Sequence, residues 1–212
     1  RAVEEIRALA QAVRDLSDHI PTLALIDGSL IMMGLVGQSF REFVLRQLID
    51  EGFVPALEEL RRMSEQRPLA VASYISLPRS TEVVSALRLE VCPYETADCG
   101  RYCGTVTVGQ RPCDETAEGL MDRQLFWELL EPGERSTVFS SPSSMVESRY
   151  GEHQVRFFYV HAGEEIGRVE VPQWVAERDD LLGLTHAAVI DQCHRGHGYP
   201  VALMEAHEQA VV

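Results

Sequence analysis

The sequence predicts an α/β protein with a mixed sheet flanked by helices. Two continuous apolar runs, at 22–26 and 68–76, have the composition of buried strands, and the first is expected to lie centrally in the sheet. Further along, 155–160 and 166–171 are expected to be strands joined by a short turn at 161–163. Because such a turn joins antiparallel strands, the sheet should contain both strand directions.

Helical periodicity fills the segments between these strands. Residues 2–17 carry apolar side chains at the spacing of an amphipathic helix. Residues 39–65 predict one or two helices, broken near Gly52 and Pro55. The other expected helices are one capped by Ser80 or Thr81 that runs to about Glu90, one at 117–130, one at 181–193, and a last helix that starts at Pro200.

Composition limits the class of protein. The 212 residues are 45% hydrophobic, which is enough to build the core of one domain or of two small ones. The net charge is −14, which argues against a protein that holds nucleic acid by bulk electrostatics. A nuclease with a local basic track beside an acidic metal site is still compatible with this charge. The longest apolar run, 22–37, is interrupted by Asp27, so no membrane anchor is expected.

The two ends of the sequence fall inside structural patterns. Arg1 already belongs to a helical pattern, and Val212 lies in an apolar stretch. We therefore expect a piece of a longer protein, incomplete at both ends, in which 1–212 form one domain.

Asp27 is the sharpest local signal in the sequence. It is followed by Gly28 and Ser29 and stands at the carboxyl end of the first buried strand, where open α/β sheets place their ligands. Gly28 would let the backbone turn at that point. The alternative is an Asx-type turn that only ends the strand.

Glu5 lies four residues before Leu9, so the first helix carries it at the edge of the apolar face. An acid in that position needs a cation or a metal as partner, unless it reaches water at the rim. The helix leads into the strand that ends at Asp27, so the two acids can converge on a divalent ion.

Two histidines and a tyrosine near the end of the chain are further candidates. Leu203, His207 and Val211 fall on one helical stripe, so His207 is expected to face inward beside Tyr199. It is either a core histidine or a metal ligand or proton-transfer group. His186 on the preceding helix is a weaker candidate of the same kind.

Two arginines could contact phosphate. Arg79 lies in the turn after the second buried strand, and Arg168 shares a strand face with Glu170. The alternatives are a solvated Arg79 and an Arg168–Glu170 ion pair that serves structure.

Four cysteines crowd into a loop-like segment at about 91–116, which we interpret as an insertion. The spacing Cys92-x6-Cys99-x3-Cys103-x9-Cys113 could enclose one zinc or bind an iron–sulfur cluster. The alternative is unliganded thiols in a surface loop. The fifth cysteine, Cys193, is expected to stay free.

Several blocks of the chain together resemble the NurA nuclease family. The two most specific blocks are GRVEVPQW at 167–174 and GYPVALMEAH at 198–207. The resemblance extends over most of the chain, through the blocks LALIDGSLI (23–31), SYISLPRST (73–81), MDRQLFWELLEPGERS (121–136), FFYVHAGEEIGRVEVPQWVA (157–176) and GYPVALMEAHEQAVV (198–212).

This resemblance implies a ribonuclease H-like fold and a metal site built from carboxylates. The family's members are similar to 5′-to-3′ DNA exonucleases, often with single-strand endonuclease activity, that prefer Mn²⁺, with Mg²⁺ as the alternative ion. They form homodimers and work with a HerA-type hexameric ATPase in processing DNA ends. It also implies a role for Tyr199 and His207 in positioning phosphate or water, and a cytoplasmic location is expected.

The family pattern has an early Asp, and much later a Glu on a helix before a second strand end with Asp-Gly. Glu5 and Asp27 match the later pair, which would put the early Asp before Arg1 and leave the catalytic set incomplete here. Alternatively, Asp27 is the first acid. Two other classes stay open: a non-catalytic binding or assembly module stapled by zinc, and a metal-dependent hydrolase of small phosphate substrates.

Overall fold

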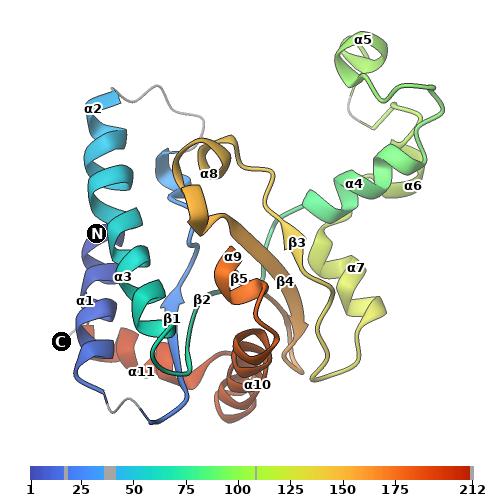
Figure 1. The fold of residues 1–212 in the computed structure, drawn as a ribbon. Helices are drawn as coiled ribbons and strands as arrows, with labels where there is room; N and C mark the ends of the chain where they lie inside the picture. Colours follow the sequence, from blue (N-terminus) through green and yellow to red (C-terminus); the bar gives the residue numbers. More distant parts are fainter. Residues whose placement is uncertain (17–18, 36–41, 108, 211–212) are drawn as a thin grey trace.

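The fold is built on one mixed sheet. The computed structural model describes residues 1–16, 19–35, 42–107 and 109–210 (Figure 1). Within these, the strand order is β1-β2-β5-β4-β3; β1 and β2 are parallel, and the other neighbours are antiparallel. This confirms the predicted α/β class and is consistent with a ribonuclease H-like fold. The strands are β1 (Thr22–Asp27), β2 (Leu69–Ile75), β3 (Phe139–Ser140), β4 (Val155–His161) and β5 (Ile166–Pro172).

The prediction that the first strand lies centrally is wrong. In the described sheet β1 is the outer strand and most of its residues are half-buried, whereas β2 is buried from Leu69 to Tyr74. Leu23 and Leu25 pack with one face of the sheet, and Ala24 and Ile26 with the other. An apolar run therefore identified a strand but not its position in the sheet.

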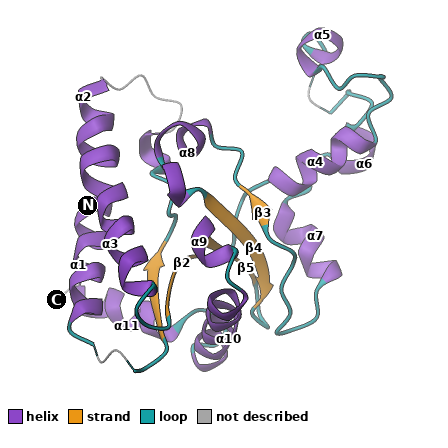
Figure 2. Cartoon of the chain, viewed as in Figure 1, coloured by secondary structure: helices purple, strands orange, loops and turns teal. Residues whose placement is uncertain are grey.

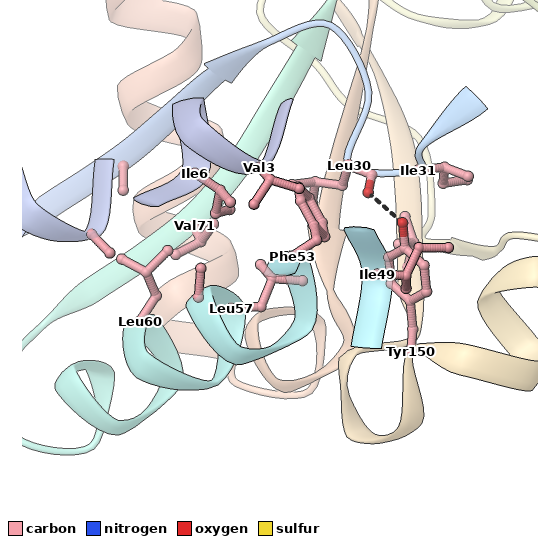
Figure 3. Close-up of a cluster of buried hydrophobic side chains, with 14 of the residues drawn as sticks. Val3, Ile6, Leu30, Ile31, Ile49, Phe53, Leu57, Leu60, Val71 and Tyr150 are labelled. Atoms are coloured by element: carbon pink, nitrogen blue, oxygen red, sulfur yellow. Dashed lines mark hydrogen bonds between the residues drawn. The ribbon is translucent and has the colours of Figure 1, made fainter. Parts of the chain in front are cut away.

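One face of β1 and β2 is covered by α1 (Ala2–Arg14) and a long helical segment behind it. Val3, Ile6, Phe53, Leu57 and Val71 meet in this core, as Figure 3 shows. Complete burial of one such side chain contributes roughly 1.5–3 kcal/mol relative to exposure. This packing holds the amino end of α1 beside the carboxyl end of β1.

The predicted helix break near Gly52 and Pro55 does not occur. The chain runs without interruption through α2 (Glu42–Leu45), a π-helical segment (Arg46–Phe53) and α3 (Val54–Ser64); residues 39–41 lie outside the described part. Pro55 falls in the first turn of α3, directly after the π-helical segment. A Cβ on Gly52 would lie 3.0 Å from Val3 Cγ1, so glycine allows α1 to approach closely.

The opposite face of the sheet packs against three helices near the end of the chain. Leu181, Val189 and Leu203 belong to one buried cluster with residues of β2 and β5. Helices thus flank the sheet on both faces (Figure 2). These helices are α9 (Gln173–Ala176), α10 (Asp179–Arg195) and α11 (Val201–Ala210), close to the predicted bounds.

A lobe formed by residues 82–121 extends away from the sheet (Figure 1). The segment predicted to be a loop contains two short helices, and the helix predicted from residue 117 begins only at Asp122. The lobe is connected to the sheet through α7, whose Phe126 packs on Phe157 and Tyr159. Its helices and the adjoining ones are α4 (Glu82–Glu90), α5 (Cys99–Cys103), α6 (Asp114–Ala117), α7 (Asp122–Leu129) and, before β4, α8 (Ser144–Arg149).

Helix α4 is capped by a residue distant in the sequence. Neither predicted cap is used: Thr81 makes no side-chain capping bond, and the Ser80 hydroxyl is hydrogen-bonded to Tyr159 Oη at 2.7 Å. The buried carboxylate of Asp122 instead accepts the amides of Val83 (3.3 Å) and Val84 (2.8 Å). A local sequence pattern cannot predict such a cap, because Asp122 is far from α4 in the sequence.

None of the described helices combines the length and the apolar character needed to cross a membrane.

Candidate active site

Asp27 ends β1 at a sharp turn. Gly28 has φ of +96°, in the region that favours glycine, and its amide donates to the Tyr74 carbonyl at 2.9 Å. Asp27 is exposed, while Leu30 three residues later is fully buried. The predicted turn is confirmed, and it leaves the carboxylate at the open end of the strand.

Asp27 and Glu5 line the same pocket. This acidic pocket has a volume of about 340 Å³ and is lined by Arg1, Ala2, Glu5, Ile26, Asp27, Ser29 and Phe53. Arg1 Nε donates to Glu5 Oε1 at 2.7 Å. The hydrogen bond with Glu5 and the Glu5 charge raise the pKa of Arg1, and the charge of Asp27 adds to them.

The two acids reach the acidic pocket from different sides. Asp27 lies on the same strand face as Leu23 and Leu25, which pack with α10 and α11, whereas Glu5 comes from α1 on the other face. They can share a pocket because β1 is the outer strand of the described sheet. Their sharing of a metal ion stays a prediction.

Tyr199 binds Asp27 directly. Its hydroxyl donates to Asp27 Oδ1 at 2.9 Å. Burial, and then the negative charge of Asp27, raise the pKa of Tyr199. The phenol therefore stays protonated and acts as a donor at neutral pH.

Tyr199 is supported by a buried tyrosine beneath it. The ring of Tyr74 meets the Tyr199 ring edge-on, with centroids 5.7 Å apart. Tyr74 Oη donates to Glu165 Oε1 at 2.7 Å, in the turn between β4 and β5. A Cβ on Gly167 would overlap the Tyr74 ring, so the ring can occupy its place only because residue 167 is a glycine.

The histidines are placed differently from the prediction. His207 is exposed on α11, so its inward orientation was wrong: only Leu203 of the proposed stripe is buried, and Val211 lies outside the described residues. His186 Nε2 is hydrogen-bonded to the Gly133 carbonyl at 3.0 Å, and burial lowers its pKa. Among the described contacts neither imidazole touches Asp27 or Glu5.

Both candidate arginines line a second and larger cavity. This arginine pocket, of about 730 Å³, is lined by Arg79, Arg168, Glu82, Glu170, serines 29, 80, 141, 143 and 144, and the apolar residues Ile31, Ile75, Pro78 and Pro142, with Gly28. Ser29 lines both this pocket and the acidic pocket. The two cavities therefore adjoin at the turn that follows Asp27.

Arg168 lies in a buried ionic network on the floor of the arginine pocket. Its Nε donates to Glu170 Oε1 at 3.0 Å, and its Nη1 pairs with Glu82. The predicted Arg168–Glu170 pair is thus confirmed. Burial alone would lower the pKa of Arg168, but the two carboxylates more than offset it. Arg79, by contrast, is exposed and has no ion pair among the described residues.

Glu170 also fixes the turn after Asp27. Its Oε2 accepts the Ser29 hydroxyl at 2.7 Å and the Leu30 amide at 2.9 Å. Glu170 is 2% exposed, so these donors replace the water that a carboxylate would otherwise bind. The position of Asp27 therefore depends on a carboxylate two strands away.

Asp27 and Glu5 offer carboxylate oxygens as metal ligands. The oxygens of Asp27 and Glu5 fit a hard divalent ion, which is often held by one or two carboxylates together with water and substrate phosphate. Within the described ranges, no group of three or more His, Cys, Asp and Glu side chains is arranged to hold a metal ion. A metal ion shared by the two acids would therefore take only part of its ligands from them.

The four clustered cysteines line one cavity of about 220 Å³, the cysteine pocket. All five cysteines are free thiols, and Cys193 lies apart, buried against the core. Burial, and then the neighbouring thiols, raise the pKa of Cys103. A metal in this pocket stays a prediction.

Comparison with protein families matches residues 1–212 to the NurA domain. The chain belongs to the NurA family. NurA proteins are nucleases that act on DNA and generally depend on a divalent metal. Neither the comparison with curated proteins nor that with solved structures gives a significant match.

The sequence did not predict the residues that hold Tyr199 in place beside Asp27. Tyr74 and Glu165 gave no signal, because one lies in an apolar run and the other in a hairpin turn. Gly167 stood in the specific block GRVEVPQW, and a glycine inside a strand is the signal that could have indicated close packing.

Gly167→Ala should destabilise the protein by about 1–3 kcal/mol, because the new methyl group must displace the Tyr74 ring from a packed core. The matched control is Gly183→Ala in α10, where nothing lies within 4 Å; it should stabilise by about 0.5–1 kcal/mol. Denaturant unfolding measures both. Equal free energies of unfolding for the two variants would contradict the packing described for Tyr74.

Proposed function

We propose that this chain is a divalent-metal-dependent deoxyribonuclease domain that hydrolyses phosphodiester bonds at the acidic pocket. The observation that carries the proposal is the strand-end acid Asp27, which lines one pocket with Glu5 in a chain that matches the NurA domain throughout. The proposed activity is 5′-to-3′ exonuclease action on DNA ends, with single-strand endonuclease activity beside it.

Asp27 and Glu5 are proposed to bind Mn²⁺, or Mg²⁺, through their carboxylate oxygens. A divalent ion held there supplies the Lewis acidity that phosphodiester hydrolysis requires. Tyr199 keeps Asp27 Oδ1 engaged at 2.9 Å and so directs the other carboxylate oxygen. Arg1 forms an ion pair with Glu5, and the divalent ion would displace Arg1 when it binds Glu5.

The DNA strand is proposed to run from the acidic pocket across Ser29 into the arginine pocket. Arg79 is the first candidate for a phosphate contact, because it is exposed and not engaged in an ion pair among the described residues. Arg168 is the second candidate, with two of its guanidinium nitrogens already bound to carboxylates. The apolar lining of the same pocket suits the face of a base.

Delivery of DNA by a partner fits the charge of the chain. A net charge of −14 opposes capture of DNA by the protein surface as a whole. We propose that a HerA-type hexameric ATPase presents the DNA, that the nuclease acts as a homodimer, and that the reaction takes place in the cytoplasm.

The position of His207 leaves it a proposed role at the surface. It is exposed on α11, the helix that follows Tyr199, so it could contact phosphate or water once DNA is bound. His186 is proposed only as a support for the Gly133 turn.

Asp27→Asn should lower Mn²⁺-dependent DNA hydrolysis by about 100-fold or more, because it removes a charged ligand from the ion. Asp191→Asn on α10 is the matched control, since this exposed acid pairs only with Arg195 among the described residues. It should retain wild-type activity. The measurement is the initial rate on labelled DNA with Mn²⁺ and with chelator. Full activity in Asp27→Asn would refute the proposed site.

Arg79→Ala should weaken DNA binding equally for all sequences and reduce the slope of log affinity against log salt by about 1. The melting temperature should not change, because Arg79 is exposed. Arg195→Ala, on the face of α10, is the control and should leave the slope unaltered. A wild-type slope for Arg79→Ala in a fluorescence anisotropy titration would remove Arg79 from the DNA path.

A further inference from the structure

The cysteine pocket collects thiols from three separate segments of the lobe. Cys92 follows α4, Cys99 and Cys103 are the two ends of α5, and Cys113 precedes α6. All four line one cavity of about 220 Å³. Four thiols that line one cavity match the donor set of a tetrahedral metal site.

The lobe has little apolar burial to hold it in place. No residue between 85 and 121 belongs to any of the buried hydrophobic clusters of the described chain. Ordering a residue costs about 1–2 kcal/mol of backbone entropy, so the lobe needs another source of stability. Part of it comes from Asp114, whose buried carboxylate pairs with Arg88 and accepts the amides of Gly109 and Arg111.

Two arginines of the cysteine pocket each have a buried N–H group that lacks a hydrogen-bond acceptor in the described structure. Arg88 and Arg111 both line the cavity, and the Nε atom of each is buried with no hydrogen-bond partner in the described structure. A buried, unsatisfied donor costs about 1–3 kcal/mol, and more when it is charged. Both arginines line the same cavity as the four cysteines, so sulfur is an acceptor that these donors could use.

We propose that the cysteine pocket is a structural tetrathiolate zinc site, with Cys92, Cys99, Cys103 and Cys113 as ligands and the Nε groups of Arg88 and Arg111 as donors to sulfur. Each thiol releases its proton to solvent as its sulfur binds the ion. Four thiolates around Zn²⁺ carry a net charge of −2, which the two guanidinium groups offset in part, because Arg88 is also paired with Asp114. Zinc fits because the site has a structural task that needs no redox chemistry.

Binding must contract the pocket. No three of these thiols are at metal-ligand spacing in the described structure, whereas zinc holds sulfur at about 2.3 Å. The sulfur atoms lie on short elements, α5 being a helix of 5 residues, so they can move inward without disturbing the sheet. Metal binding and ordering of the lobe are therefore one coupled event.

Elemental analysis of the full chain, purified with zinc present and then dialysed, should give about one zinc per chain. Cys99→Ser should lose it, and Cys193→Ser should keep it, because Cys193 lies in the core away from the lobe. Titration of the zinc-free wild type with Co²⁺ needs no variant and should give thiolate-to-cobalt absorption that saturates at one ion per chain. These readouts do not involve DNA, so they can succeed or fail independently of the proposed nuclease activity.

The role of the arginines has its own test. Arg111→Leu removes the proposed Nε donor and should release zinc to a chelator about 10-fold faster, the size of effect that loss of an outer-shell partner produces. Arg101→Leu, exposed on α5, should match the wild type. The proposal is overturned by iron–sulfur absorbance, by a zinc content that Cys99→Ser leaves unchanged, or by the absence of a cobalt signal in the folded protein. Equal release rates in both arginine variants would overturn the arginine part.

Discussion

The buried carboxylate of Glu170 is the contact on which the site depends. One oxygen accepts from Ser29 and Leu30 in the turn after Asp27, and the other accepts from Arg168. Arg168 in turn pairs with Glu82 at the start of α4, so one network connects the candidate catalytic turn with the lobe. Removing one member of a buried pair costs about 3–5 kcal/mol, because its partner is left charged without compensation.

Two cavities meet at this turn, and their chemistry differs. The acidic pocket holds Asp27 and Glu5, while the arginine pocket has a floor of paired charges and an exposed Arg79 at its lining. Ser29 belongs to both, and its hydroxyl is held by Glu170. A phosphodiester strand needs carboxylates for the metal and a cation for the next phosphate. Ser29 lines both cavities, so the proposed metal site and the proposed phosphate site adjoin at this turn.

Local patterns in the sequence predicted most elements but few of the contacts between them. The strands 155–160 and 166–171, the glycine turn at Gly28 and the Arg168–Glu170 pair depend on neighbouring or alternating residues, and these were correct. The cap of α4 by Asp122, the support of Tyr199 by Tyr74 and the exposure of His207 depend on tertiary packing. Periodicity identifies an apolar face, but it cannot tell which partner covers that face.

The central claim is that Glu170 holds the turn after Asp27, and Glu170→Gln tests it most directly. An amide offers one acceptor oxygen and one NH₂ group, so either the Ser29 and Leu30 donors or the Arg168 donor must face another N–H. Hydrogen–deuterium exchange of the amides at 29–32 is the measurement. The account predicts much faster exchange there, while the β4 and β5 amides stay protected. Unchanged protection at 29–32 in a folded Glu170→Gln protein would contradict it.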